Sequence, residues 1–352
     1  MMQPSTGELV LPDGVLEAEP VRVRAAREVV EYLPVWMFFF YGCLLLNTSL
    51  TNLNPARPDL AHLAIFPLLV FVGFYAVRAL RAADVTNRAL MIGATFGLAL
   101  LLPLANITWH QPSPLSHDGL LAAYELSNFG WAAMMLWHAA RKNRGHVLLF
   151  FGVGLFYGAC LENGGILLGY FHETKLDITR VPPFLAPVAT MVGWCVVLYM
   201  ATFVVWKLRV QIGALRRSPV VSGLLVATVA TMLDLHIDPL ATAVGCWVWD
   251  AQLPPWFHGV PLTNFVAWMC ALFPFAWLMF REQKRAAIRD GGAWPRESLY
   301  RLLVRVPATL CVAFILFGTT MGLLEGFDGP AWSVLYALGD RALPVLLAIV
   351  GL

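Results

Sequence analysis

Residues 218–249 read SPVVSGLLVATVATMLDLHIDPLATAVGCWVW, and this stretch indicates both the class of fold and the place of a site. Its first part is an apolar run about long enough to cross a bilayer, which takes roughly 20 residues. Two carboxylates, Asp234 and Asp238, stand near the end of that run. Charged groups inside a membrane segment are costly and commonly functional. The stretch therefore predicts a membrane helix that carries an acidic site.

The composition of the whole chain indicates a polytopic membrane protein. Of its 352 residues, 59% are hydrophobic and only 13% are charged, whereas soluble domains carry about 25% charged residues. We therefore predict an all-α integral membrane protein with about ten transmembrane helices, an eight-helix core followed by a C-terminal pair. The apolar runs place these helices at about 30–50, 60–80, 88–108, 119–140, 146–171, 183–206, 218–240, 261–280, 301–324 and 330–352.

The basic residues predict how these helices are oriented. Twenty of the 24 Lys and Arg residues fall on one side of the predicted membrane, three fall on the other, and Arg341 lies within the last helix. Because Lys and Arg concentrate in cytoplasmic loops, both termini are expected in the cytoplasm. We expect a bacterial or archaeal cytoplasmic membrane. The predicted divisions are a cytoplasmic tail, a transmembrane core, a basic cytoplasmic connection and a C-terminal helix pair, at 1–29, 30–281, 282–300 and 301–352.

Several predicted helices place a polar residue at the same depth. Glu125 lies in the outer third of its helix, Glu162 in the outer half of the next, and Asn264 at the outer start of a later one. Gly158 lies one turn before Glu162, and small residues let helices approach closely, so Glu162 should face the bundle. We predict a polar pocket in the outer half of the bilayer, covered by the connection 246–260.

The spacing of Asp234 and Asp238 suits acid chemistry. The two share one helical face, with side chains roughly 6 Å apart. Two carboxylates this close in a low-dielectric site resist carrying two negative charges, and a general acid needs a carboxyl that keeps its proton. His236 would point to another face, where a structural hydrogen bond is its commoner role, and Pro239 is expected to break or bend the helix. The alternative for each acid is a structural role, as a helix cap or a headgroup contact.

Two tryptophans follow the aspartates closely. Trp247 and Trp249 stand beside the acids, in the connection that is predicted to cover the pocket. Aromatic faces stabilise cations, which would suit a carbocation intermediate. The alternative is an aromatic belt at the membrane interface. We therefore treat both side chains as candidate pocket walls.

Three motifs stand close together in this region: Asp234-x-x-x-Asp238-Pro239, Gly245-x-Trp247-x-Trp249, and Gly259-Val-Pro-Leu-Thr-Asn264-Phe followed by Trp268. Together they resemble the signature of the carotenoid biosynthesis membrane proteins, which include carotenoid 1,2-hydratases of the γ-carotene and bisanhydrobacterioruberin type. Glu162 and the glycine-rich segment that follows it up to Tyr170 also resemble a glutamate-containing, glycine-rich helix of this family. The resemblance is clearest over 150–281. The chain departs from the family in two places. It has Ala267 where the family has a glycine, and from Leu167 it reads Leu-Leu-Gly-Tyr-Phe-His-Glu where the family often has a Phe-Gly-x-Tyr-x-Tyr run.

The resemblance implies addition of water to a terminal isoprenoid double bond, which gives a tertiary alcohol without a redox cofactor or a metal. Asp238 or Asp234 would donate the proton, and Glu162 would orient the water. The expected substrate is a hydrophobic isoprenoid from the bilayer, other carotenoid-pathway enzymes are candidate partners, and no nucleic acid is expected. The oligomeric state stays open. The residues expected around the substrate are Asn264, Trp247, Trp249, His236, Glu125 and Tyr170.

Other reactions fit parts of this pattern. A polyprenoid cyclase or isomerase would use the same carboxylates but keep water from the cation. A lipid or proton-coupled transporter would use buried acids to carry protons. A diiron enzyme would need clustered histidines and a prenyltransferase two Asp-rich motifs, and the chain has neither. The six cysteines lack the spacing of a redox or metal pair.

Overall fold

The structure is a computed structural model that describes residues 30–35, 37–38, 117–173, 179–243, 245–334 and 336. The helices and strands below all belong to the unit formed by residues 34–352. The predicted tail over 1–29 and the predicted helices over 30–50, 60–80, 88–108 and 330–352 lie wholly or largely outside the described residues.

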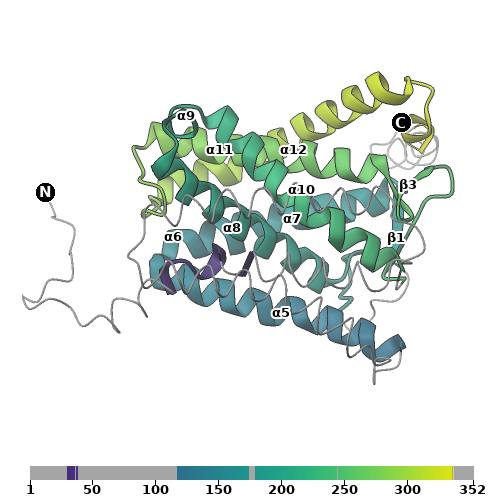
Figure 1. The fold of residues 1–352 in the computed structure, drawn as a ribbon, viewed down its shortest axis with the longest axis horizontal. Coiled ribbons are helices and arrows are strands. Elements are labelled where there is room, and N and C mark those ends of the chain that lie inside the picture. Colours follow the sequence, from purple (N-terminus) through teal and green to yellow (C-terminus); the bar gives the residue numbers. More distant parts are fainter. Residues whose placement is uncertain are drawn as a thin grey trace, which may run out of the picture. The chain divides into compact units, whose positions relative to one another are not determined.

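The described part is mostly helical, and each of the six helices predicted within it is present (Figure 1). The fifth predicted span is built from three consecutive pieces, of which the middle one is π-helical. Short turns of helix lie between the longer ones. The helices are α5 (His117–Lys142), α6 (Arg144–His146), the π-helix η1 (Val147–Val153), α7 (Gly154–Leu167), α8 (Val188–Gln211), α9 (Gly213–Arg217), α10 (Pro219–Ala243), α11 (Leu262–Arg285) and α12 (Arg296–Glu325).

Five helices in the described ranges are long and apolar enough to cross a membrane. They are Arg144–Leu167, Val188–Val210, Pro219–Pro239, Leu262–Arg285 and Arg296–Glu325. Helix α5, predicted as a span over 119–140, is not one of the five. The membrane character of the chain is thus confirmed over these segments. The total of ten helices and the cytoplasmic position of both termini stay predictions.

Helix α8 lies at the centre of the described helices and contacts α5, α7 and α10. Helix α11 packs most extensively against α10 and also holds α12. Glycines set two of these close approaches: a Cβ added at Gly223 would lie 2.7 Å from the backbone nitrogen of Trp277, and one added at Gly158 would lie 2.6 Å from the Cβ of Trp194. Close packing of α10 on α11 and of α7 on α8 therefore depends on residues without side chains.

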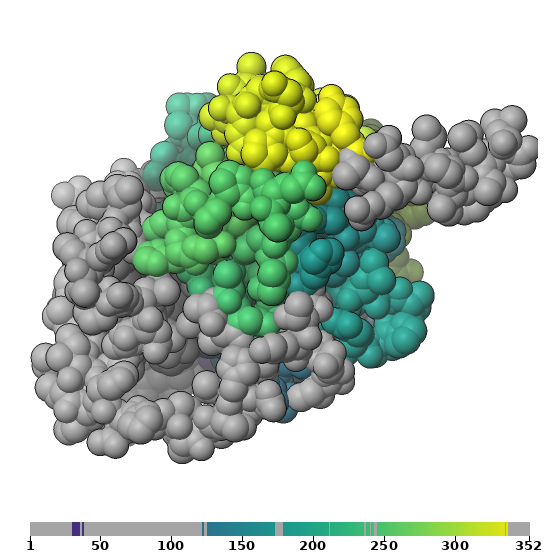
Figure 2. Space-filling view, turned by 90° about the vertical axis from the view of Figure 1, so that its right-hand side faces the viewer, coloured from purple at the N-terminus to yellow at the C-terminus, as the bar shows by residue number. Residues whose placement is uncertain are grey.

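Two small antiparallel sheets connect the helices at one end of the bundle. Strand β1 (Phe171–Glu173) pairs with β2 (Trp247–Trp249), so that Phe171 lies opposite Trp249. Strand β3 (Pro255–Phe257) pairs with β4 (Val260–Pro261). Figure 2 shows this face, where the green segment around β3 and β4 lies beside the yellow end of α12. The predicted covering connection is therefore tied by a strand pair to the segment that follows α7.

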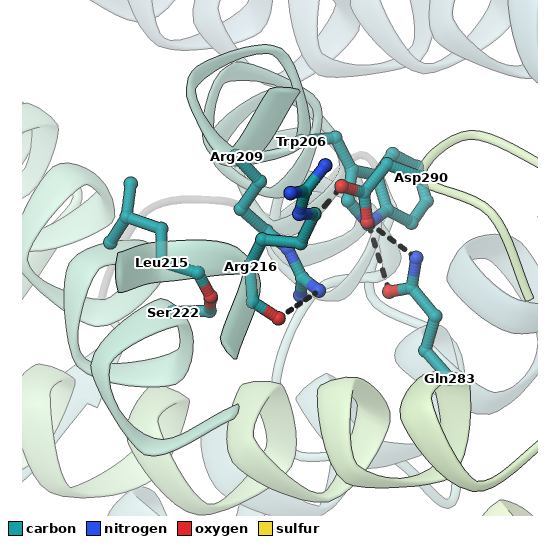
Figure 3. A network of polar contacts seen from close by, with 7 residues as sticks. All are labelled: Trp206, Arg209, Leu215, Arg216, Ser222, Gln283 and Asp290. Carbon is teal, nitrogen blue, oxygen red and sulfur yellow. Dashed lines mark hydrogen bonds and ion pairs between the residues drawn. The ribbon is translucent and has the colours of Figure 1, made fainter. Parts of the chain in front are cut away.

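A buried polar network fixes the connection after α11 (Figure 3). The Nε atom of Arg209 lies 3.3 Å from the Asp290 carboxylate. Gln283 donates to the same carboxylate at 2.6 Å and accepts from Trp206 at 3.1 Å. Burial raises the pKa of Asp290 even though Arg209 opposes the shift. The desolvation of the pair thus offsets its attraction, as is usual for buried ion pairs.

Replacing Asp290 with Ala is expected to destabilise the fold by about 3–5 kcal/mol, because Arg209 would remain buried without its partner. The measurement is the midpoint of thermal unfolding of the purified protein in one detergent. Arg289→Ala removes an exposed charge next in the chain and is the control. A double variant, Arg209→Met with Asp290→Leu, should recover most of the loss. An equal loss in the control would refute the assignment.

Candidate active site

A cavity of about 170 Å³ lies among α5, α7, α8, α10, α11, α12 and the strands β1, β2 and β4. Most of the residues that line it are apolar or aromatic, and few polar side chains reach it. The polar ones include Asn128, Glu162, Asp238, Thr263 and Asn264. An apolar pocket on which a few polar groups converge is the usual form of a small-molecule site.

The acidic part of the site is formed by α10 and the start of α11. The Nδ2 atom of Asn264 donates to the Asp234 carboxylate at 2.9 Å and also to the Asp238 carboxylate. A side-chain amide carries two hydrogens, so one residue can serve both acids. Both aspartates are buried, but only Asp238 lines the cavity. Among the described residues, neither forms an ion pair with a cation.

Helix α10 carries the two aspartates through a proline. Pro239 has no N–H and cannot donate to the carbonyl of Leu235. The helix nevertheless continues to Ala243, so Pro239 does not break it, and the predicted alternative, a bend, stays a prediction. The continuous helix keeps Asp234 and Asp238 one turn apart on one face. Extensive packing against α11 then sets both beside Asn264.

Glu162 approaches the cavity from α7 and is oriented by a tryptophan. The indole Nε1 of Trp194 donates to the Glu162 carboxylate at 2.5 Å. The Trp194 ring stacks on Trp268, with ring centroids 4.4 Å apart. Because Gly158 has no side chain, it leaves room for Trp194 one turn before the acid. Glu162 therefore faces the bundle, as its helical position predicts, and lines the cavity together with Asp238.

The aromatic walls come from the strands and the segment before them. Trp247 and Trp249 of β2 both line the cavity. The Trp249 indole donates to Thr242 at 3.0 Å, whereas the buried Trp247 nitrogen has no hydrogen-bond partner in the described part of the chain. Tyr170 also lines the cavity, and its hydroxyl donates to the carbonyl of Ala331 at 3.1 Å. Aromatic side chains therefore form part of the wall of the cavity that Asp238 and Glu162 also line.

A family model described as carotenoid biosynthesis protein matches residues 124–339. The chain belongs to this family. The match covers well over half of the chain and includes every residue that lines the cavity. No curated protein and no solved structure matches the chain. Membership points to a role in carotenoid biosynthesis and, with the apolar helices, to an integral membrane location.

Two of the residues predicted to surround the substrate, Glu125 and His236, are not among the described residues that line the cavity of this carotenoid biosynthesis protein. Glu125 does not line the cavity. Its carboxylate accepts from the backbone N–H of Thr179 at 2.6 Å and from the Thr179 hydroxyl, which anchors the segment before α8. This is the structural role that the sequence left open. The backbone of His236 belongs to α10, but its side chain lies outside the described part of the chain.

The structure also adds residues that the sequence had not assigned to the pocket of this family member. Trp194 and Trp268 line the cavity and position Glu162. The spacing of Trp268, one turn after Asn264, places both on one helical face and could have indicated this. Asn128 lies three residues after Glu125 and reaches the cavity. Among the described residues, no group of three or more His, Cys, Asp or Glu side chains is arranged to hold a metal ion.

Proposed function

We propose that this protein hydrates a terminal isoprenoid double bond of a carotenoid-like lipid and releases a tertiary alcohol. One observation carries the proposal: Asp238, which shares the Asn264 amide with the buried Asp234, and Glu162 from another helix both line one apolar, aromatic cavity. Family membership supports a carotenoid-like substrate. The reaction needs an acid, a stabilised cation and a base for water, and these residues can supply all three.

Asp238 is the proposed proton donor, because it lines the cavity and Asp234 does not. Placing several anions in an apolar site without cations is very unfavourable, so one carboxyl is expected to hold a proton. That proton moves to the less substituted alkene carbon. A C–H bond forms, the π bond breaks, and the positive charge stays on the tertiary carbon. Asp234 and Asn264 then stabilise the Asp238 carboxylate.

Glu162 is the proposed base for the second step. The aromatic faces of Trp247 and Trp249 stabilise the tertiary cation while water approaches. The water oxygen forms a C–O bond to the cation, and Glu162 accepts the released proton. Asp238 has lost one proton and Glu162 has gained one, so a proton must return between them through water before the next turnover. The net change is the addition of one water without oxidation or reduction.

The products that form in cells test this proposal against the alternatives. Lipids from cells that make acyclic carotenoids would be analysed by mass spectrometry, with and without the protein, in water enriched in ¹⁸O. Hydration predicts a product heavier by one water, with its oxygen taken from the solvent. A product of unchanged mass would replace the proposal with a cyclase or isomerase. An unchanged carotenoid profile would exclude these substrates and favour a transporter.

A further inference from the structure

The cavity is much smaller than the substrate class that the proposed function requires. Its volume is about 170 Å³, and an engineered apolar cavity of about 150 Å³ holds a molecule as small as benzene. Pockets that enclose drug-sized ligands measure roughly 300–1,000 Å³. A group about the size of one isoprene unit can fit inside, and a long polyisoprenoid cannot. Most of such a substrate must lie outside the cavity.

Helix α12 forms a wall of the cavity that reaches from the interior to the surface. Ala313, Phe314 and Phe317 line the cavity from this helix. Phe317 is only 6% exposed, whereas Phe314 is 42% exposed. A Cβ added at Gly164 on α7 would lie 3.7 Å from the tip of the Phe314 ring. The Phe314 ring therefore lies between α12 and α7 at the edge of the cavity.

Helices α12 and α7 have few contacts with each other, and α12 packs mainly against α11. The exposed side chains of α12 around Phe314 are apolar, and they include Val312 and Ile315. On α7, Phe156 and Leu167 are exposed as well. Both helices are among the segments apolar enough to span a membrane. An opening at this place would face lipid chains, which suits a hydrophobic chain that leaves the cavity.

We propose that the cavity binds only one end of the substrate, which enters between α7 and α12 past Phe314 while the rest of the chain stays in the bilayer. The inference rests on the proposed function and specifies its substrate class. The protein recognises the terminal unit and does not measure chain length. A substrate with two identical ends must leave, turn and bind again before its second end reacts, so a singly hydrated product is released first.

Activity on matched substrates provides the first test. Acyclic polyisoprenoids of several chain lengths with the same terminal unit should give kcat/KM values within about tenfold of one another, whereas a substrate closed by a ring at both ends should not react. Phe314→Trp should lower kcat/KM on the order of tenfold for every length. Leu303→Trp, at an exposed position about three turns before Phe314 on the same helix, should have no effect. A steep dependence on chain length, or equal effects of both variants, would overturn the proposal.

Photolabelling of the wild-type protein provides a second test that does not require turnover. One polyisoprenoid probe carries a diazirine in its terminal unit and another carries it in the middle of the chain. The terminal probe should label peptides of the cavity around Trp247, and the mid-chain probe should label peptides around Phe314. Labelling of the peptides around Trp247 by both probes would overturn end-on binding. The expected labelling without any hydrated product would leave end-on binding standing while the proposed reaction fails.

Discussion

Asp238→Asn is expected to reduce hydration by about 10²–10⁴-fold, the usual contribution of a general acid. Asparagine has nearly the same shape, and its amide oxygen can still accept the hydrogen bond from Asn264. It cannot deliver an acidic proton to the alkene. Because every later step needs the cation, both the alcohol and any isomer should disappear. The measurement is the rate of product formation by the purified protein in lipid vesicles, followed by mass spectrometry.

Asp328→Asn is the matched control, because it removes one carboxylate from an exposed position outside the cavity. Its activity should equal that of the wild type, and size-exclusion chromatography in detergent should show that both variants are folded. Asp234→Asn should retain more activity than Asp238→Asn, since Asp234 does not line the cavity. Full activity of Asp238→Asn would remove this residue from the reaction and contradict the proposed donor.

The sequence predicted the parts of this site that depend on local rules. Long apolar runs identify membrane helices because a fixed bilayer thickness sets their length. Asp234, Asp238 and Glu162 are conspicuous because a charge in such a run is costly. Asn264 could be predicted to lie at the same depth in the bilayer as these acids, because it stands at the outer start of a predicted helix. The structure brings all four polar residues to one end of the bundle, with Asp238, Glu162 and Asn264 at the cavity.

The remaining features depend on contacts between segments far apart in the chain. The pairing of β1 with β2 joins residues on either side of α8 and α10, and no local pattern of three-residue strands could indicate it. Glu125 has the same local signature as Glu162, a lone acid within a predicted apolar span. Only its contact with Thr179 shows that it holds a connecting segment. The role of Trp194 likewise depends on how closely Gly158 lets α7 approach α8.

Glu162→Gln is expected to change the product as well as the rate. Glutamine can still accept the hydrogen bond from Trp194 through its amide oxygen, so the side chain should keep its place. It cannot take a proton from water, and hydration should fall by about 10²–10⁴-fold. Asp238 still protonates the alkene, and the resulting cation must lose a neighbouring proton instead. The recovered carotenoid should therefore contain isomers with a shifted double bond and deuterium from D₂O.

The products of this variant distinguish the roles of Asp238 and Glu162, which a reaction rate alone does not. Asp238→Asn should abolish deuterium incorporation, whereas Glu162→Gln should retain it while the alcohol disappears. Glu297→Gln is the control, because its carboxylate is 88% exposed on the first turn of α12 and pairs only weakly with Arg301. If Glu162→Gln lowered the alcohol without any isomer or deuterium exchange, Glu162 would be required before the cation forms. The donor and the base would then have to be exchanged, with Glu162 supplying the proton and Asp238 receiving the one released from water.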